Sequence, residues 1–188
     1  MNIGILGGTF DPPHLGHLLI AEEVRIALKL DEVWFIPTYT PPHKADAVSN
    51  SKDRLNMLEL AIETNPYFRV NTLELERSGK SYTFDTMKIL KNAYPQYSFY
   101  FIIGADMVEY LPNWYRIDEL VELVQFVGVT RAGYQLETDY PVLTLNIPMI
   151  DVSSSMLRER LKNNQPIRYF VPEQVYNYIK ENQLYERK

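Results

Sequence analysis

The chain has 188 residues, 46% of them hydrophobic, which is enough for one domain with a sizeable core. Its net charge of -5 argues against a broadly basic surface for nucleic acid, so any binding of phosphate must be local. The chain has no cysteine, which excludes disulfides and thiolate metal sites. Because neither a signal peptide nor a run of about eighteen apolar residues is recognisable, we expect a cytoplasmic protein without a membrane span.

The first element is a short apolar segment, Ile3 to Leu6, which predicts a buried strand. A glycine-containing turn follows, and the apolar periodicity of Leu18 to Leu30 predicts a helix that begins near His14. The adjacent Gly7 and Gly8 let the backbone bend sharply and approach a ligand. Because the free N–H groups and the dipole at a helix start favour anions, this turn is suited to phosphate.

Strands and helices alternate along the rest of the chain. Further strands are expected at 32–36, 68–73, 98–103, 126–130 and 142–147. Further helices are expected at 51–64, 83–94, 154–163 and 172–181, with loops at 37–50 and after 73. This order predicts an α/β fold, a Rossmann-like doubly wound parallel sheet with helices on both faces. We expect a single domain, 1–188, in which the C-terminal helices, about 153–188, pack as a small subdomain.

Two histidines, His14 and His17, are three residues apart, so both imidazoles are expected on one face of the first helical turn. Imidazole can donate hydrogen bonds to phosphoryl oxygens and stabilise charge during transfer. A zinc site is an alternative, with a third ligand from His43 or Asp11, and residues without function at a helix end are another. Gly79-Lys80-Ser81 is not a Walker loop, because the required upstream glycine is missing.

Three more segments combine polar groups with a predicted element boundary. Prolines in the loop Pro37 to Lys44 limit its freedom, so Lys44 is either a held charge for phosphate or part of a rigid surface turn. The hydroxyls of Ser81 to Thr86 open a helix and suit capping. Asp106 follows the strand at 98–103, where a carboxylate suits either a ribose or a helix cap.

Two segments near the middle and the end of the chain are also candidates. Trp114 and Tyr115 form an aromatic pair that is either a lid on the core or a stacking surface for an aromatic base or pyridinium ring. The serines at 153–155 open a helix, and Arg158 follows one turn later. They form either a second anion site or a plain serine cap.

The turn after the first strand, Gly7-Gly8-Thr9-Phe10-Asp11-Pro12-Pro13-His14-Leu15-Gly16-His17, closely resembles the signature of the nucleotidyltransferase superfamily, and within it that of the nicotinate-nucleotide adenylyltransferases. Three later segments resemble further motifs of that family, in its order: Pro41-Pro42-His43-Lys44, Lys80-Ser81-Tyr82-Thr83-Phe84-Asp85-Thr86, and Val152-Ser153-Ser154-Ser155-Met156-Leu157-Arg158. The last departs from the family's Ile-Ser-Ser-Thr-x-x-Arg at Val152 and Ser155 but keeps the hydroxyl. The resemblance covers essentially the whole chain.

The resemblance implies transfer of AMP from ATP to nicotinate mononucleotide, with Mg²⁺ carried by ATP and no protein metal ligand. The catalytic residues would be His14, His17, Lys44 and Arg158. ATP would be bound by Gly7, Gly8, Thr9, Phe10, His14, His17, Gly104, Asp106, Ser153, Ser154, Ser155 and Arg158. Nicotinate mononucleotide would be bound by Gly8, Thr9, Lys44, Ser81, Tyr82, Thr83, Thr86, Asp106, Trp114 and Tyr115.

Two other functions stay open at this point. Phosphopantetheine adenylyltransferase shares the first and last motifs, but the resemblance of Pro41 to Lys44 and of Ser81 to Thr86 points away from it. A nucleotide-binding regulator without turnover would fit the fold, although the intact His14 and His17 speak against it. The oligomeric state is also open, a homodimer included.

Overall fold

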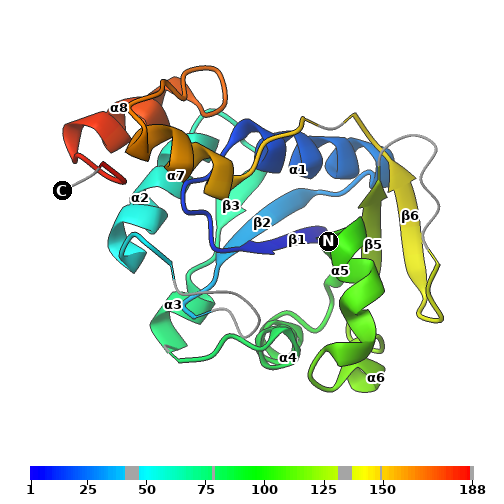
Figure 1. Ribbon diagram of the computed structural model, residues 1–188. Coiled ribbons are helices and arrows are strands. Elements are labelled where there is room, and N and C mark those ends of the chain that lie inside the picture. Colours follow the sequence, from blue (N-terminus) through cyan, green and yellow to red (C-terminus); the bar gives the residue numbers. More distant parts are fainter. Residues whose placement is uncertain (41–46, 78, 131–136, 149, 187–188) are drawn as a thin grey trace.

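The computed structural model describes residues 1–40, 47–77, 79–130, 137–148 and 150–186 (Figure 1). Six strands form one sheet, in which all neighbours are parallel and the order is β3-β2-β1-β4-β5-β6. The strands are β1 (Asn2–Gly8), β2 (Glu32–Pro37), β3 (Phe68–Val70), β4 (Ser98–Gly104), β5 (Gln125–Thr130) and β6 (Val142–Asn146). Strand order reverses between β1 and β4, so the carboxyl ends of these two strands form the switch point at which ligands bind in such sheets.

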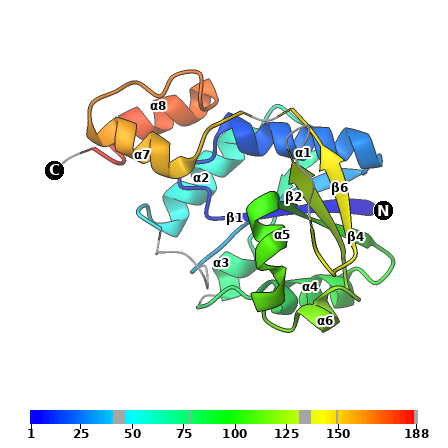
Figure 2. The ribbon, with the colours of Figure 1, turned by 45° about the vertical axis from the view of Figure 1, so that its right-hand side comes forward.

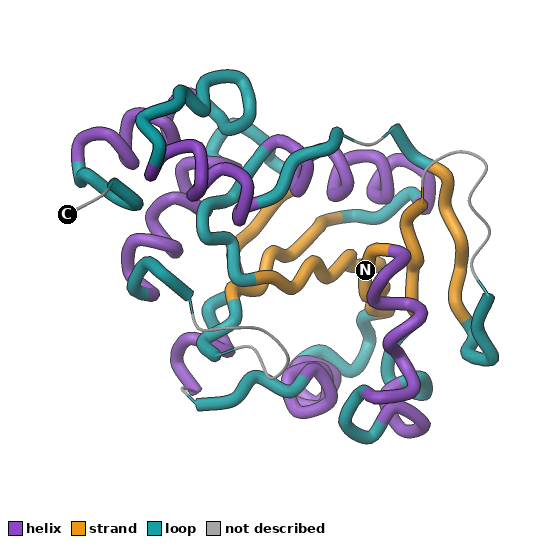
Figure 3. The backbone as a smooth tube through the Cα atoms, viewed as in Figure 1, coloured by secondary structure: helices purple, strands orange, loops and turns teal. Residues whose placement is uncertain are grey.

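Helices cover both faces of the sheet, as predicted, and Figure 3 shows the strands running between two groups of them. The helices are α1 (Leu15–Leu28), α2 (Ser51–Ile62), α3 (Leu73–Arg77), α4 (Thr83–Ala93), α5 (Ala105–Tyr110), the 3-10 turn η1 (Leu111–Asn113), α6 (Ile117–Leu120), α7 (Ser154–Lys162) and α8 (Glu173–Glu181). Alternate residues of β2 illustrate the two layers. Phe35 joins the core under α1, α2, α7 and α8, whereas Trp34 joins the core under α4, α5 and α6.

The segment after β3 differs from the prediction. A strand was expected to run from 68 to 73, but β3 ends at Val70 and the short helix α3 begins at Leu73. The Asn71 side chain accepts a hydrogen bond from the Leu73 backbone N–H (3.1 Å), which turns the chain out of the extended conformation. The predicted polar loop is therefore partly helical.

The C-terminal helices lie on the same side of the sheet as α1 and α2, and Figures 1 and 2 both show α7 and α8 beside α2. Leu157 of α7 and Val175 of α8 are fully buried in the core shared with those helices. The Tyr178 hydroxyl of α8 donates to Asp53 of α2 (2.8 Å). That the C-terminal helices act as a separate subdomain stays a prediction. Within the described ranges, no helix is long and apolar enough to cross a membrane.

Candidate active site

The turn after β1 is held by an inward-pointing aromatic ring. Phe10 has a left-handed backbone (φ 50°), is 1% exposed, and packs its ring edge-on against His17 at 5.0 Å between centroids. A Cβ atom on Gly8 would come within 3.0 Å of that ring, so the glycine permits the close approach. Because the Phe10 ring belongs to the core, any contact of this residue with ATP is left to its backbone.

The predicted shared face of the two histidines is present. The imidazoles of His14 and His17 are stacked, with centroids 3.6 Å apart and planes 20° from parallel. The His14 backbone N–H donates to His17 Nδ1 (3.2 Å). A neutral His17 ring must therefore carry its proton on Nε2, which makes that atom a hydrogen-bond donor.

His14 differs from His17 in its surroundings. It is 6% exposed, and burial lowers its pKa from 6.5 to about 4, so the ring is neutral at pH 7. Its Nδ1 is buried and has no hydrogen-bond partner among the described residues. A Cβ on Gly16 would come within 3.1 Å of this ring and 3.0 Å of Val152, so a larger residue would require these neighbours to move by a few tenths of an ångström. His14 is thus a buried, neutral group rather than a charged one.

The start of α1 offers fewer free donors than expected. The Leu15 N–H donates to the Phe170 carbonyl (2.9 Å), and the His17 N–H donates to the His14 carbonyl (3.0 Å). The prediction of free N–H groups at this helix start is therefore wrong for these two. The Leu15 bond is tertiary, because the segment before α8 lies against the start of α1, whereas the His17 bond is local to the first turn of the helix.

The first turn of α7 lies on the β1–α1 turn, so the structure brings these two predicted parts of the site together. Arg158 donates through Nη1 to the Asp11 carbonyl (2.7 Å) and through Nη2 to Ser155 Oγ (3.2 Å). The Ser154 hydroxyl donates to the Pro12 carbonyl (2.8 Å), and Ser153 caps the helix. Since guanidinium has five N–H donors, Arg158 keeps donors for an anion while it anchors the turn.

The segment at 81–86 uses several of its hydroxyls internally. Ser81 is 5% exposed and its Oγ accepts from the Tyr39 N–H (3.2 Å). The Thr86 hydroxyl donates to the buried Glu74 (2.7 Å), whose pKa is raised by burial. These side chains fix the start of α4. The Thr86 hydroxyl has a single proton, so it could donate to substrate only by breaking its bond to Glu74. Residues 41–46, with the predicted Lys44, lie outside the described part of the chain.

The aromatic pair is divided between core and surface. Trp114 is half-buried, packs edge-on against Phe101 and Phe126 (5.8 Å each), and has its Nε1 buried without a partner in the described structure. Tyr115 is 49% exposed, with its ring 4.9 Å from that of Tyr82. The inner part of the Trp114 indole therefore covers the core, as the lid alternative predicts. The exposed ring of Tyr115 suits the other alternative, a stacking surface.

The end of β4 lies beside the end of β1, as the topology requires. Asp106 is exposed, and a Cβ on Gly104 would come within 2.8 Å of its Oδ1. The carboxylate thus folds back over Gly104 at the switch point. This is the place at which the sequence predicts contact with ribose.

Two buried residues at the site, Arg54 and Tyr185, are not among those predicted from the sequence. Arg54 is 2% exposed and donates to the carbonyls of Thr9 and Thr38 (both 2.8 Å), which ties the ends of β1 and β2 together. Its position continues the buried helical stripe at 57, 58, 61 and 62, and that periodicity was the available signal. The Tyr185 hydroxyl donates to Asp11 Oδ1 (2.6 Å), a contact with no local sequence signal.

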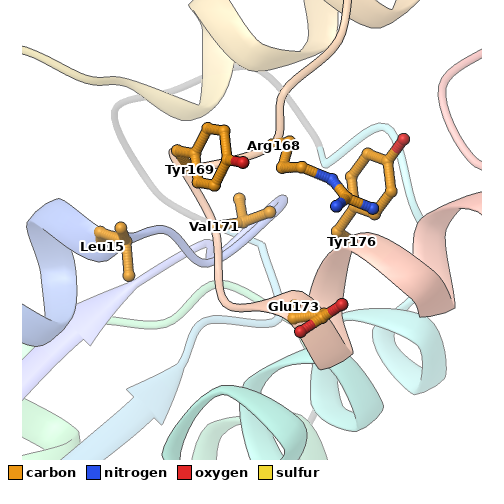
Figure 4. Close-up of a pocket in the computed structure, with 6 residues that line it drawn as sticks. All are labelled: Leu15, Arg168, Tyr169, Val171, Glu173 and Tyr176. Carbon is orange, nitrogen blue, oxygen red and sulfur yellow. The ribbon is translucent and has the colours of Figure 1, made fainter.

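A pocket of about 240 Å³ lies between the start of α1 and the segment leading into α8 (Figure 4). It is lined by Leu15, Arg168, Tyr169, Val171, Glu173 and Tyr176. None of these was predicted as a site residue. In the described ranges, no group of three or more His, Cys, Asp and Glu is placed to hold a metal ion.

Comparisons with a family model, with known sequences and with solved structures all show that the chain is similar to nucleotidyltransferases. The cytidylyltransferase-like family model matches residues 5–160. A probable nicotinate-nucleotide adenylyltransferase of Oceanobacillus iheyensis is 60% identical over 97% of this chain and 96% of its own length. The nicotinate-nucleotide adenylyltransferase of Bacillus subtilis is 54% identical over 98% of each chain. Nicotinic acid mononucleotide adenylyltransferase of Plasmodium falciparum, complexed with NaAD, has the same fold (TM-score 0.80, 24% identity, 98% of this chain and 97% of that one). The chain belongs to the nicotinate-nucleotide adenylyltransferase family.

Proposed function

We propose that the chain transfers AMP from MgATP to nicotinate mononucleotide, giving deamido-NAD and pyrophosphate, a step of NAD biosynthesis. The observation that carries this proposal is the stacked pair His14 and His17, which stands between the end of β1 and the start of α7 with its Arg158. Hydrogen-bond donors and the Arg158 guanidinium therefore lie along the turn that follows β1. This is the arrangement that transfer of a phosphoryl-linked group needs.

The chemistry requires alignment more than activation. The attacking 5′-phosphate has a second pKa of about 6, so it is largely ionised at neutral pH and needs no general base. The site must instead align two anions and stabilise the charge that passes to pyrophosphate. Nε2–H of His17 suits a donor to the transferring phosphate, and Arg158 suits a grip on the β- or γ-phosphate. Lys44 and neutral His14 would support these contacts.

The mononucleotide would lie between the start of α4 and the exposed Tyr115. The Tyr82 side chain provides no cap to α4, which leaves the helix start suited to a carboxylate. Asp106 at the end of β4 would hold a ribose. We propose small molecules as the substrates and the cytoplasm as the location, with no nucleic acid or membrane partner; a homodimer stays a prediction.

One assay separates the three functions. Pyrophosphate release is measured with ATP plus nicotinate mononucleotide, nicotinamide mononucleotide or phosphopantetheine in parallel. We expect rapid release with the first, slower release with the second and none with the third. Release with phosphopantetheine alone would favour the related superfamily member. A chain that binds ATP but releases pyrophosphate with none of them would be a regulator.

A further inference from the structure

A buried carboxylate anchors the turn that precedes the two histidines. Asp11 is 2% exposed, and its side chain accepts hydrogen bonds from the Tyr185 hydroxyl (2.6 Å) and the Val48 N–H (2.7 Å). Tyr185 is itself 8% exposed. Burial, followed by the charge of Asp11, raises the pKa of Tyr185, so its hydroxyl stays a donor at neutral pH. A residue of the segment after α8 therefore reaches into the turn between β1 and α1.

The backbone of the same turn is held by other residues of the C-terminal part. Arg158 donates to the Asp11 carbonyl (2.7 Å) and Ser154 donates to the Pro12 carbonyl (2.8 Å). The carbonyl of Phe170 accepts from the Leu15 N–H (2.9 Å). Figure 2 shows the C-terminal helices against the start of α1. The C-terminal part therefore helps to fix the position of the turn, together with Val48 and Arg54.

We propose that Tyr185 is a positioning residue for adenylyl transfer, which acts through Asp11 on the His14–His17 pair; this inference rests on the proposed function. Asp11 is separated from His14 only by Pro12 and Pro13, whose fixed φ angles transmit a displacement instead of absorbing it. The His14 backbone N–H in turn holds the His17 ring. Because transfer depends on alignment, a small displacement of these rings lowers the rate.

The chain offers a matched control for this role. The Tyr178 hydroxyl also joins the C-terminal part to the rest of the molecule, because it accepts from Asn56 and donates to Asp53 (both 2.8 Å). These partners belong to α2 and not to the 9–17 turn. Tyr178→Phe and Tyr185→Phe each remove one oxygen atom. Tyr178→Phe loses two half-buried hydrogen bonds to α2, whereas Tyr185→Phe loses the buried hydrogen bond to Asp11.

The experiment compares the two variants with the wild type, well below their melting temperatures. We expect Tyr185→Phe to lower kcat roughly tenfold or more while the KM values for ATP and mononucleotide change by less than about twofold. Tyr178→Phe should lower the melting temperature but keep kcat. Equal kcat losses in both variants, or an unchanged kcat in Tyr185→Phe, would overturn the inference. A wild type without pyrophosphate release would instead refute the proposed function.

A second measurement does not depend on turnover. The chain has three histidines, so the imidazole signals in an NMR spectrum are few. Tyr185→Phe should shift two of the three, those of His14 and His17, and Tyr178→Phe should leave both in place. Asp11→Asn combined with Tyr185→Phe should cost no more in kcat than the more damaging single change, since Tyr185 acts only through Asp11. Unmoved histidine signals, or independent effects of the two changes, would show that Tyr185 only stabilises the fold.

Discussion

His14 lies flat against His17, and the two rings are not equivalent. Their centroids are 3.6 Å apart, and the His14 N–H fixes the His17 ring through Nδ1. His14 is 6% exposed, and its lowered pKa keeps it neutral, whereas His17 is half-buried. The spacing in the motif treats the residues alike, but their different surroundings predict different effects when each is replaced.

His17→Ala should lower kcat by roughly 100-fold or more, because it removes one donor to the transferring phosphate. ATP binding, measured by titration calorimetry, should suffer less. His17→Asn is the companion variant, since its amide oxygen can still accept from the His14 N–H. An equal loss of kcat in both variants would assign the effect to the ring, and near-normal turnover in His17→Ala would remove the proposed role.

His14 should make the protein less stable in mild acid. Its pKa is 6.5 in the unfolded chain and about 4 in the folded one, so between these values only the unfolded chain binds the proton. The free energy of unfolding that depends on neutral His14 is therefore fully present above pH 6.5 and is lost as pH falls towards 4. The shift corresponds to roughly 3 kcal/mol of unfolding free energy.

Urea unfolding at a series of pH values between 7.5 and 4 checks this prediction. His14→Asn replaces the ring with a group that does not titrate, and should flatten the decline relative to the wild type. The carboxylates titrate in both proteins, so the difference between the two curves isolates His14. Parallel curves would mean that His14 is protonated in the folded state or does not differ from a solvated histidine.

Arg158→Ala should raise the KM for ATP roughly tenfold or more and that for the mononucleotide much less, because only ATP has β- and γ-phosphates. The change also removes the bond to the Asp11 carbonyl. Ser154→Ala isolates this second effect, since it loses the bond to the Pro12 carbonyl without losing a cation. If both variants raised the KM values of the two substrates in the same proportion, Arg158 would only anchor the turn.

Much of the fold follows from the sequence, because long apolar runs alternate with helical periodicity over most of the chain. All six strands were anticipated for this reason. The helices α3 and α6 have only five and four residues, too few for a periodic signal. Their presence depends on local hydrogen bonds such as that of Asn71.

The site was less predictable than the fold, because several contacts join distant parts of the chain. Tyr185 and Asp11 are 174 positions apart, and neither residue type predicts that the two are in contact. Trp114 is drawn inward by Phe101 and Phe126, whose proximity depends on the pairing of β4 with β5. The motifs predicted where the donors are, but not which of them already have partners.

The choice between acid and amide substrates should depend on α4 rather than on Trp114. The pyridine rings of the two mononucleotides are alike, so stacking and cation–π attraction cannot distinguish them. The 3-substituents differ, because a carboxylate only accepts hydrogen bonds whereas an amide presents an N–H₂ group. Backbone N–H groups at the start of α4, and that of Tyr115, would donate hydrogen bonds to the carboxylate but would face the N–H₂ group of the amide as donor against donor. We therefore expect a strong preference for nicotinate mononucleotide.

Two substitutions separate these contributions. Trp114→Ala should lower kcat/KM for both mononucleotides by similar factors, and it should also reduce stability by roughly 3 kcal/mol or more, because the indole packs on the core. Thr83→Pro deletes the N–H of the first residue of α4, a position at which proline is tolerated, and the extended Tyr82 before it (ψ 127°) suits proline. This variant should lose selectivity, since one donor to the carboxylate is gone while the stacking surface is intact. Values of kcat/KM for both mononucleotides test the two substitutions. Selectivity would not depend on α4 if the wild type used both substrates equally, if Trp114→Ala lost its preference, or if Thr83→Pro kept its preference in full.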